Sequence, residues 1–300
     1  MAIIRWLWSQ PYLLLILTTA MWGGNAVAGK MAVSHISPFL LTLSRWGFAM
    51  LIIWPLAWPH VRREWPKIRP ALPIMLALGA CGFALFNNLL YVSLQYTSAI
   101  NVTILQASMP LLVFVLNFFF FQIRSSAVQI GGLMLTIVGV LAIASRGSLA
   151  NLIALDFNIG DLINLGAVVL YGFYTVFLRK KPELHWLSNI AIMGIAGLAM
   201  SLPFAFYDVV NGSAIFPDAT GWGIIAYTAI GPSILSQVFW IRGMELVGSN
   251  RGGIFYNMIP VFGTLLAIVI LGEKFLPYHA AGFVLVMGGV WIAQRAGRKL

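Results

Sequence analysis

The segment Ala99–Phe121, AINVTILQASMPLLVFVLNFFFF, contains no charged side chain from its first residue to its last. A helix needs about 20 mostly apolar residues to cross roughly 30 Å of hydrocarbon, and this stretch is long enough. An unpaired backbone group in lipid is costly, so a lipid-embedded chain is expected to be helical. The alternation of lipid-facing and lumen-facing residues typical of a membrane barrel strand is absent. The segment therefore predicts a membrane-spanning helix.

The composition of the whole chain agrees with this prediction. Of its 300 residues, 60% are hydrophobic and only 9% are charged, and the mean hydropathy is +0.91. Soluble domains carry roughly 25% charged residues, because they must cover themselves with groups that water solvates. A water-soluble protein is thereby excluded, and the lipid bilayer is the expected surrounding.

Nine further stretches have the same character, which predicts an all-α integral membrane protein with ten transmembrane helices. The first of them, after Arg5, also resembles a signal peptide, with Ala26-Val27-Ala28 as a cleavage site. Its likeness to a later span favours a true membrane span. The expected spans are Pro11–Met31, Pro38–Ala57, Ala71–Leu94, Ala99–Phe121, Ala127–Ala144, Gly160–Leu178, Leu187–Phe206, Gly221–Ile241, Gly252–Leu271 and Pro277–Ala293.

The basic residues predict how the chain is oriented. The net charge is +10, but the positive residues form short clusters between apolar runs instead of one basic face, so nucleic acid is not an expected partner. Such clusters mark cytoplasmic loops. An inner-membrane protein with both termini in the cytoplasm would have on that side Arg5, Arg62, Arg63, Lys67, Arg69, Arg124, Arg179, Lys180, Lys181, Arg242, Arg251, Arg295, Arg298 and Lys299. The other side would keep Lys30, Arg146 and Lys274.

The chain repeats itself at a spacing of 150 residues, as from Pro110 to Pro260. Further matches at this spacing are Ile104–Ile254, Leu116–Leu266, Gly132–Gly282, Leu135–Leu285, Gly139–Gly289 and Val140–Val290. Two halves, residues 1–148 and 149–300, would then hold five spans each. Because five is odd, the second half must cross the membrane in the opposite sense. Inverted repeats are typical of transporters, whose substrate site lies near the midplane between the halves; a duplicated bundle without transport is the alternative.

Several short patterns resemble the EamA-type transporters of the drug/metabolite transporter superfamily. They are Trp22-Gly23 with Lys30, Pro110 and Pro260 in matching spans, Gly272-Glu273, and Gly288-Gly289-Val290. The resemblance covers nearly the whole chain. It implies export of metabolites or toxic compounds through a central cavity lined by the first, third and fourth spans of each half, and the chain is most similar to the exporters of amino acids, aromatic ones included. The first half departs from the pattern, because it has Gln122-Ile123-Arg124 where the second half has Gly272-Glu273-Lys274. The acidic residue has no counterpart in the first half, so Glu273 is interpreted as structural.

Polar and aromatic residues within corresponding spans are the expected lining of this cavity, because polar side chains in a span usually face the bundle interior. Amides and rings suit a neutral or zwitterionic metabolite with a sizeable apolar part; amides that only join helices are the alternative. The candidate substrate-binding residues are Trp22, Asn25, Phe86, Asn87, Gln106, Met109, Tyr171, Tyr174, Gln237, Tyr256 and Asn257.

Three residues receive other predictions. Pro110 and Pro260 are expected to kink their helices at matching depth and are candidate hinges for alternating access, or static kinks. Arg45 is the one charge well inside a span. It could meet a substrate carboxylate or bond neighbouring helices, and the second of these is favoured because the second span lies outside the expected lining.

The sequence gives no support for other kinds of chemistry. It has no Walker sequence, no nucleophile–base pair at depth and no ring of carboxylates for a channel filter, so neither a catalytic residue nor a cofactor is expected. One cysteine inside an apolar run, and four histidines far apart near span ends, predict no metal site. The histidines are expected to be solvated.

The eight acidic residues all fall outside the middle of the expected spans. Proton-driven carriers usually use buried carboxylates or histidines. The sequence therefore predicts export of small organic metabolites, amino acids with aromatic or apolar side chains among them, by alternating access and facilitated diffusion. An exporter of drugs or other metabolites, with proton coupling, is the alternative. The partner is a small-molecule substrate, and the oligomeric state is left open, a monomer included.

Overall fold

The structure is a computed structural model that describes residues 6–122, 126–154, 157–248 and 253–297. Its regular elements are helices, and none of the described residues lies in a β-strand. The expected all-α class is therefore confirmed for this part of the chain. The residues of the orientation and span predictions that lie outside the described ranges are Arg5, Arg124, Arg251, Gly252, Arg298 and Lys299.

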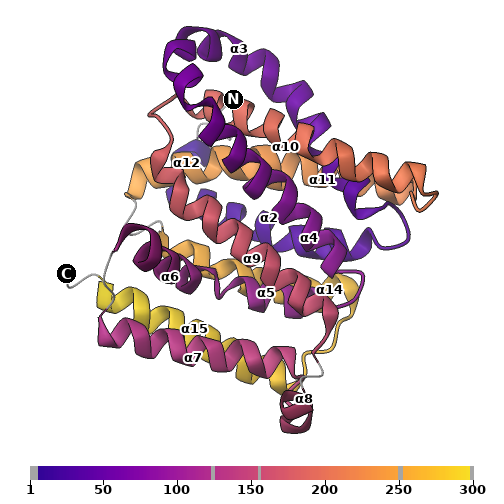
Figure 1. Cartoon of the computed structure of the whole chain (residues 1–300), viewed down its shortest axis with the longest axis vertical. Coiled ribbons are helices and arrows are strands. Elements are labelled where there is room, and N and C mark those ends of the chain that lie inside the picture. Colours follow the sequence, from indigo (N-terminus) through magenta and orange to yellow (C-terminus); the bar gives the residue numbers. More distant parts are fainter. Residues whose placement is uncertain (1–5, 123–125, 155–156, 249–252, 298–300) are drawn as a thin grey trace.

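The helices follow one another with short connections (Figure 1). The first half holds α2 (Pro11–Met31), α3 (Pro38–Gly79), the π turn η1 (Ala80–Leu85), α4 (Phe86–Ser93), α5 (Ala99–Gln106), α6 (Met109–Phe121) and α7 (Ala127–Ala144). The second holds α8 (Leu149–Ala154), α9 (Ile159–Phe177), the 3-10 turn η2 (Leu178–Lys180), α10 (Trp186–Val210), α11 (Ala219–Ile230), the π turn η3 (Gly231–Leu235), α12 (Ser236–Val247), the 3-10 turn η4 (Gly253–Met258), α14 (Ile259–Leu271) and α15 (Pro277–Gly297).

Seven helical segments of the described chain are long and apolar enough to cross a membrane, and two shorter apolar helices, Phe255–Leu271 and Pro277–Ala293, accompany them. Two of the ten expected spans fall within one segment, Pro38–Ser93, which is helical over 56 residues. Large apolar side chains point outward, as Phe119 and Val269 do with 66% and 72% exposure. Such an apolar exterior suits a lipid environment.

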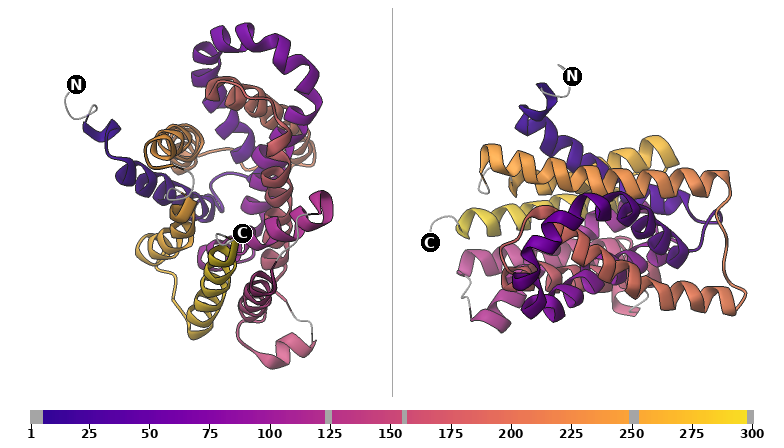
Figure 2. Two further views of the ribbon diagram at one scale, coloured as in Figure 1. Left: turned by 90° about the vertical axis from the view of Figure 1, so that its left-hand side faces the viewer. Right: turned by 90° about the horizontal axis from the view of Figure 1, so that it is seen from above.

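α3 remains helical through residues 58–70, where the sequence prediction left a break between two spans. The prolines inside the helix are Pro55, Pro59, Pro66, Pro70 and Pro73. Each removes a backbone N–H and bends the helix, without having to end it. α3 accordingly curves into an arch (Figure 2), and the basic residues between Arg62 and Arg69 lie on this arch instead of in an irregular loop.

Two π turns interrupt the helices at matching places in the two halves. η1 lies between α3 and α4, and η3 lies between α11 and α12. The repeat spacing of 150 carries η1, residues 80–85, onto residues 230–235, which include all of η3. π turns are rare and occur often at functional sites. No sequence pattern predicted them.

A new helix begins one residue before each of the two repeated prolines. α5 ends at Gln106, and α6 begins at Met109 with Pro110 in its first turn. In the second half η4 leads into α14, which has Pro260 in its first turn. Proline is favourable there, because the first N–H groups of a helix have no partner within it. The kinks expected at these prolines are therefore breaks followed by new helix starts.

The two halves contact each other through reciprocal helix pairs. α2 packs on α12 and α14, and its counterpart α9 packs on α4 and α6. α3 lies against α10, and α7 lies against α15 (Figure 1). Each half thus contributes its first long helix to contacts with the other half or its neighbouring segments in a matching way.

α7 and α15 are repeat counterparts, and they pack antiparallel with their backbones close together. A Cβ atom added to Gly132 would lie 2.5 Å from the carbonyl oxygen of Gly289, and one added to Gly289 would lie 2.5 Å from that of Gly132. Further along, a Cβ on Gly282 would lie 3.2 Å from the carbonyl oxygen of Gly139. Gly132, early in α7, thus meets Gly289, late in α15, so the two helices run in opposite directions. Small residues permit this approach.

Polar contacts gather where the loops 32–37, 94–98 and 211–218 meet, here named the closed end. Lys30 Nζ donates to the carbonyl oxygens of Leu94 and Thr97, at 2.8 Å each. This lysine thereby joins the end of α2 to the loop between α4 and α5.

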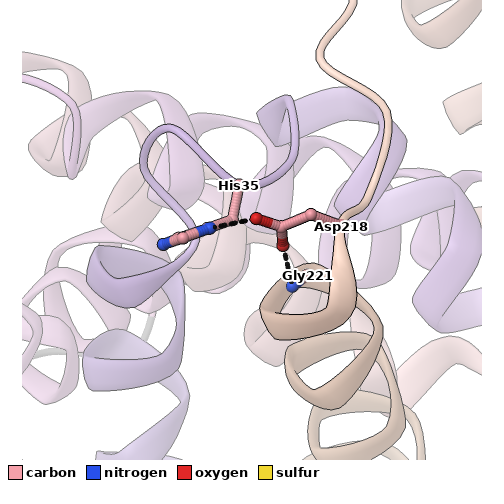
Figure 3. Close-up of polar contacts among 3 residues, drawn as sticks. All are labelled: His35, Asp218 and Gly221. Atoms are coloured by element: carbon pink, nitrogen blue, oxygen red, sulfur yellow. Dashed lines mark hydrogen bonds and ion pairs between the residues drawn. The ribbon is translucent and has the colours of Figure 1, made fainter.

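An exposed ion pair joins two other loops at the closed end (Figure 3). His35 Nδ1 lies 2.7 Å from Asp218 Oδ2, and Gly221 N–H donates to Asp218 Oδ1 at 2.8 Å. The bonds from Gly221 and His35 hold the pKa of Asp218 below its usual range. Asp218 therefore both caps α11 and ties it to the loop after α2.

Two further contacts brace the closed end. Glu273 Oε1 and Oε2 accept from the N–H groups of Ala99 and Ile100 at 2.8 and 3.0 Å, so this carboxylate caps α5, as its structural interpretation expected. Asp161 is fully buried and accepts from Thr97 Oγ1 at 2.6 Å.

His279 departs from the solvated histidines expected from the sequence. Its side chain is 3% exposed. Its Nδ1 accepts from the N–H of Leu276 at 2.9 Å, and its Nε2 lies 3.0 Å from Asn101 Oδ1. Asn101 Nδ2 in turn donates to Asp161 at 3.1 Å. This histidine therefore links α15 to the buried polar contacts of the closed end.

Candidate functional site

A cavity lies between the two halves, with about 90 Å³ open to the centres of water-sized molecules. Elements of both halves line it, including residues of both π turns. The lining residues are Trp22, Asn25, Ala26, Arg45, Trp46, Gly82, Phe83, Phe86, Asn87, Leu90, Thr103, Gln106, Ala107, Met109, Tyr171, Pro232, Gln237, Tyr256, Asn257, Ile259 and Pro260. Between the cavity and the closed end lies a buried apolar cluster that includes Ala28, Leu94 and Ile100.

The structure brings most of the predicted substrate-binding residues together around this cavity, and their role stays a prediction. Those in the lining are Trp22, Asn25, Phe86, Asn87, Gln106, Met109, Tyr171, Gln237, Tyr256 and Asn257. Of the two candidate hinges, Pro260 lines the cavity and Pro110 does not.

Tyr174 was predicted in the lining, and the structure places it outside. A Cβ on Gly82 would lie 2.6 Å from the Tyr174 ring, so the glycine of η1 makes room for this tyrosine. Its ring lies 5.1 Å from that of Tyr171, which does line the cavity. Tyr174 therefore supports Tyr171 from behind, one helical turn away on α9.

Arg45 bonds neighbouring helices, as the favoured prediction had it, but it lies in the cavity lining, where the second span was not expected. It lines the cavity, is 5% exposed, and is bonded on several sides. Nη1 donates to Asn87 Oδ1 at 2.7 Å, to Tyr91 Oη at 2.9 Å and to Asn25 Oδ1 at 3.2 Å, and Nε donates to Ser233 Oγ at 2.5 Å. The pocket expected to lack fixed charge thus contains a guanidinium, which stays protonated in proteins.

The oxygens around Arg45 are themselves held in place. Tyr91 Oη donates to Asn25 Oδ1 at 2.8 Å, and Asn87 Nδ2 donates to the Phe83 carbonyl at 2.8 Å. Ser233 Oγ, on the second π turn, donates to the Thr228 carbonyl at 2.8 Å. Because Ser233 belongs to the second half, the guanidinium joins the two halves. Such a network fixes the direction of a buried cation.

Aromatic side chains form much of the remaining wall. The rings of Phe86 and Tyr171 lie 4.8 Å apart, and those of Trp22 and Tyr256 lie 6.1 Å apart. Tyr256 Oη lies 3.2 Å from the sulfur of Met109. Rings and a thioether offer polarisable apolar contact to a ligand.

One amide of the lining lacks a partner. Gln106 Nε2 is buried and makes no hydrogen bond within the described part of the chain. A buried donor without a partner is costly. Gln106 itself lines the cavity at the break between α5 and α6, so this unpartnered donor lies beside the cavity wall.

Two lining residues that the sequence reasoning missed come from α3, namely Arg45 and Trp46. Trp46 stacks on Phe83 at 4.4 Å with rings 2° from parallel, and its Nε1 donates to the Phe83 carbonyl at 2.7 Å. A signal for Arg45 was present, since a charge within a span usually faces the interior. The family resemblance implied a lining from the first, third and fourth spans of each half, which does not include α3 at Arg45.

Metal chemistry has no candidate site in the described residues, where no group of three or more His, Cys, Asp or Glu side chains could hold an ion.

Comparison with known proteins follows the same division into halves. The model of the EamA-like transporter family matches residues 10–145 and again residues 158–294. An uncharacterized transporter, YetK, of Bacillus subtilis is 25% identical over 94% of this chain and 86% of its own length. A probable amino-acid metabolite efflux pump of Salmonella typhimurium is 26% identical over 93% of each chain. A crystal structure with 19% identity superposes with a TM-score of 0.62 over 97% of this chain and 98% of the other, which supports the fold alone.

Proposed function

This chain belongs to the EamA-like transporter family, and from that premise we propose that it exports small organic metabolites, amino acids with aromatic or apolar side chains among them. The observation that carries the proposal is the cavity between the halves, lined by rings, amides and one guanidinium. A mostly apolar pocket with a few convergent polar groups suits a small molecule. The name of the Salmonella typhimurium relative, an amino-acid metabolite efflux pump, supports the same substrate class.

The protein works as two inverted halves of five spans, which together make ten. Two observations support this arrangement. The counterpart helices α7 and α15 pack antiparallel, as inversion requires, and the arch of α3 allows Pro38–Ser93 to supply two spans. Inverted halves around a midplane site are typical of carriers with alternating access.

The protein lies in the inner (plasma) membrane with both termini in the cytoplasm. The support is the distribution of Lys and Arg, of which Arg62, Arg63, Lys67 and Arg69 lie on the arch of α3. With this orientation the closed end faces outward. The tight packing between that end and the cavity then corresponds to a state open toward the cytoplasm.

The change between inward and outward states uses the helix interruptions next to the cavity. Pro110 and Pro260 start new helices at matching positions, and the π turns η1 and η3 lie at matching positions too. Interrupted backbone hydrogen bonding lowers the cost of a local bend. These four places are therefore the proposed joints of alternating access.

The export cycle is uniport-like, driven by the substrate gradient, because none of the described residues that line the cavity carries a carboxylate. One observation favours the alternative, a proton-coupled exporter of drugs or other metabolites. Asp161 is fully buried and hydrogen-bonded to Thr97 and Asn101, and buried carboxylates serve as proton relays in carriers. Transport by proteoliposomes without any imposed proton gradient distinguishes the two, since strict dependence on such a gradient would contradict the uniport cycle.

Loss of labelled amino acids from cells that express the protein tests the proposal. Labelled phenylalanine, tyrosine and leucine should leave these cells faster than cells carrying the Tyr256→Ala variant. Tyr207, which is 65% exposed, supplies the matched control, and Tyr207→Ala should export like the unmodified protein. Export of cationic dyes alone, with no amino acid leaving faster, would contradict the proposed substrate class.

A further inference from the structure

The cavity has a net positive charge. Arg45 is the only ionised side chain among the described residues that line it. No carboxylate forms an ion pair with Arg45 in the described part of the chain, where the ion pairs are His35–Asp218 and Arg242–Glu245. All four hydrogen-bond acceptors of Arg45 belong to neutral side chains. These groups orient the guanidinium and leave its charge uncompensated.

A buried, uncompensated arginine is an unusual element to keep in a membrane protein, because burial of an unpaired charge is strongly unfavourable. Four neutral acceptors reduce this penalty without removing it. Nη2 of Arg45 makes no hydrogen bond among the described residues, whereas Nη1 and Nε make four. A carboxylate in the cavity would supply both the missing acceptor and the missing negative charge.

The other described lining residues offer a cation no carboxylate. An ammonium group would find amide and phenol oxygens but no carboxylate, and the Oδ1 atoms of Asn25 and Asn87 already accept from Arg45. The wall that includes Phe86, Tyr171 and Tyr256 instead receives an aromatic or branched apolar body. The pocket thus has one anion-binding group and one apolar wall.

We infer that the preferred substrates are organic monocarboxylate anions with an aromatic or apolar body, bound by their carboxylate to Arg45, and that amino acids bind more weakly because their ammonium has no acidic partner. This inference rests on the proposed carrier function and narrows its substrate class. Binding neutralises the cavity, so the loaded carrier crosses with no net charge in its site and the empty carrier returns with one positive charge. Each cycle of export therefore moves one negative charge outward.

Competition between three molecules of one shape tests the inference on the unmodified, full-length protein. The probes are 3-phenylpropanoate, which has only the carboxylate; L-phenylalanine, which has both groups; and 2-phenylethylamine, which has only the amine. Displacement of radiolabelled 3-phenylpropanoate from purified protein should need at least tenfold more L-phenylalanine than unlabelled 3-phenylpropanoate. The amine should not compete. L-Phenylalanine that competes equally well or better overturns the inference.

Two variants identify the group responsible. Arg45→Gln should weaken binding of 3-phenylpropanoate at least 30-fold, and Arg45→Lys should weaken it less, because the charge is kept. Arg179→Gln is the control, since Arg179 bonds Asn117 away from the cavity. Because loss of Arg45 could also impair folding, elution as a single peak in size-exclusion chromatography is required of each variant. Equal binding by well-folded Arg45→Gln would overturn the assignment.

Charge movement provides a readout that binding alone does not. In proteoliposomes with a potassium-valinomycin potential, efflux of 3-phenylpropanoate should accelerate when the interior is negative and slow when the potential is reversed. An efflux rate independent of potential contradicts the charge balance. If no aromatic solute shows counterflow, the carrier proposal itself fails; if L-phenylalanine shows counterflow and the carboxylate has no advantage, only this inference fails.

Discussion

In the first half the cavity is lined by Arg45 and Asn87, whereas the positions 150 residues later hold Ile195 and Gln237. Tyr256 of the second half likewise corresponds to Gln106 of the first. The first half therefore supplies the charge, and the second half supplies a phenol where the first has an amide. The lining has diverged between the halves at nearly every position that a substrate could touch.

The scaffold around that lining has diverged far less. π turns, proline-led helix starts and glycine contacts recur at the repeat spacing. Even the left-handed residue that ends α6, Gln122, has its counterpart in Gly272 at the end of α14. Packing therefore constrains both halves equally, while recognition of an asymmetric substrate needs two different walls. Substitutions at paired positions test each part of this statement.

The largest effects are expected at the shared scaffold. Gly132→Leu and Gly289→Leu should each destabilise the protein by about 3 kcal/mol, because the added side chain meets the backbone of the facing helix. Thermal unfolding in detergent measures both. Gly131→Leu is the control, since a Cβ there meets nothing within 4 Å. A large loss of stability from one of these substitutions and none from the other would contradict the expectation that both halves are constrained equally.

Paired substitutions in the lining should have unequal effects. Asn87→Ala removes the 2.7 Å acceptor of Arg45, and hydrogen bonds to charged groups contribute about 1.5–3 kcal/mol, so the KM for a carboxylate substrate should rise about tenfold or more. Gln237→Ala, at the corresponding position, should raise it by no more than about threefold, because Gln237 makes no bond to Arg45. Transport kinetics in proteoliposomes compare them. Equal changes would mean that the two walls contribute alike.

Glu273, which caps α5, has no acidic counterpart in the first half, where Ile123 stands at the matching position. Glu273→Gln should lower stability by about 1 kcal/mol, through loss of a charged cap. The melting temperature in detergent reports this loss. Glu245→Gln, which alters an exposed ion pair with Arg242, should change it little. A larger fall in melting temperature for Glu245→Gln than for Glu273→Gln would contradict the predicted contribution of the cap.

The smallest effect is expected at Asp218, whose pKa is held below its usual range by Gly221 N–H and His35. A lowered carboxyl pKa contributes stability above the unfolded value, near 4, and this contribution is lost as pH falls through the folded value. Between pH 7 and about pH 3 the unmodified protein should therefore lose slightly more thermal stability than Asp218→Asn. Parallel pH profiles of the two proteins would argue against the ion pair.

Much of the architecture could be predicted from the sequence because hydrocarbon imposes strict rules. Apolar length fixed most span positions, as at Pro11–Met31 and Ala127–Ala144, where expected and observed bounds coincide. Polar side chains such as Asn25 and Gln237 were expected to face inward, and they line the cavity. Matching glycines indicated the repeat because close helix contacts tolerate little else at those positions.

The missed features depend on local geometry that residue types do not specify. Prolines in α3 could equally have ended the helix or bent it, and the packing of α3 on α10 decides between these. η1 changes the direction of side chains along its helix, and Tyr174 fills the space beside Gly82 instead of the cavity. Arg45 could be recognised as unusual, yet its four acceptors come from segments far apart in the chain, so only the fold reveals them.

The unbroken run of helix from Pro38 to Ser93 has a mechanical consequence. Arg45 and Asn87 stand on opposite limbs of one bent rod, and they are bonded across it although 42 positions separate them along the chain. The limbs are also clamped together where Trp46 lies flat on Phe83. A ligand that pulls on the guanidinium therefore loads both limbs together, and the load reaches the π turn η1, to which Phe83 belongs. Movement of the limbs as a pair then requires bending at η1 and at the short connections that flank the rod, residues 32–37 and 94–98.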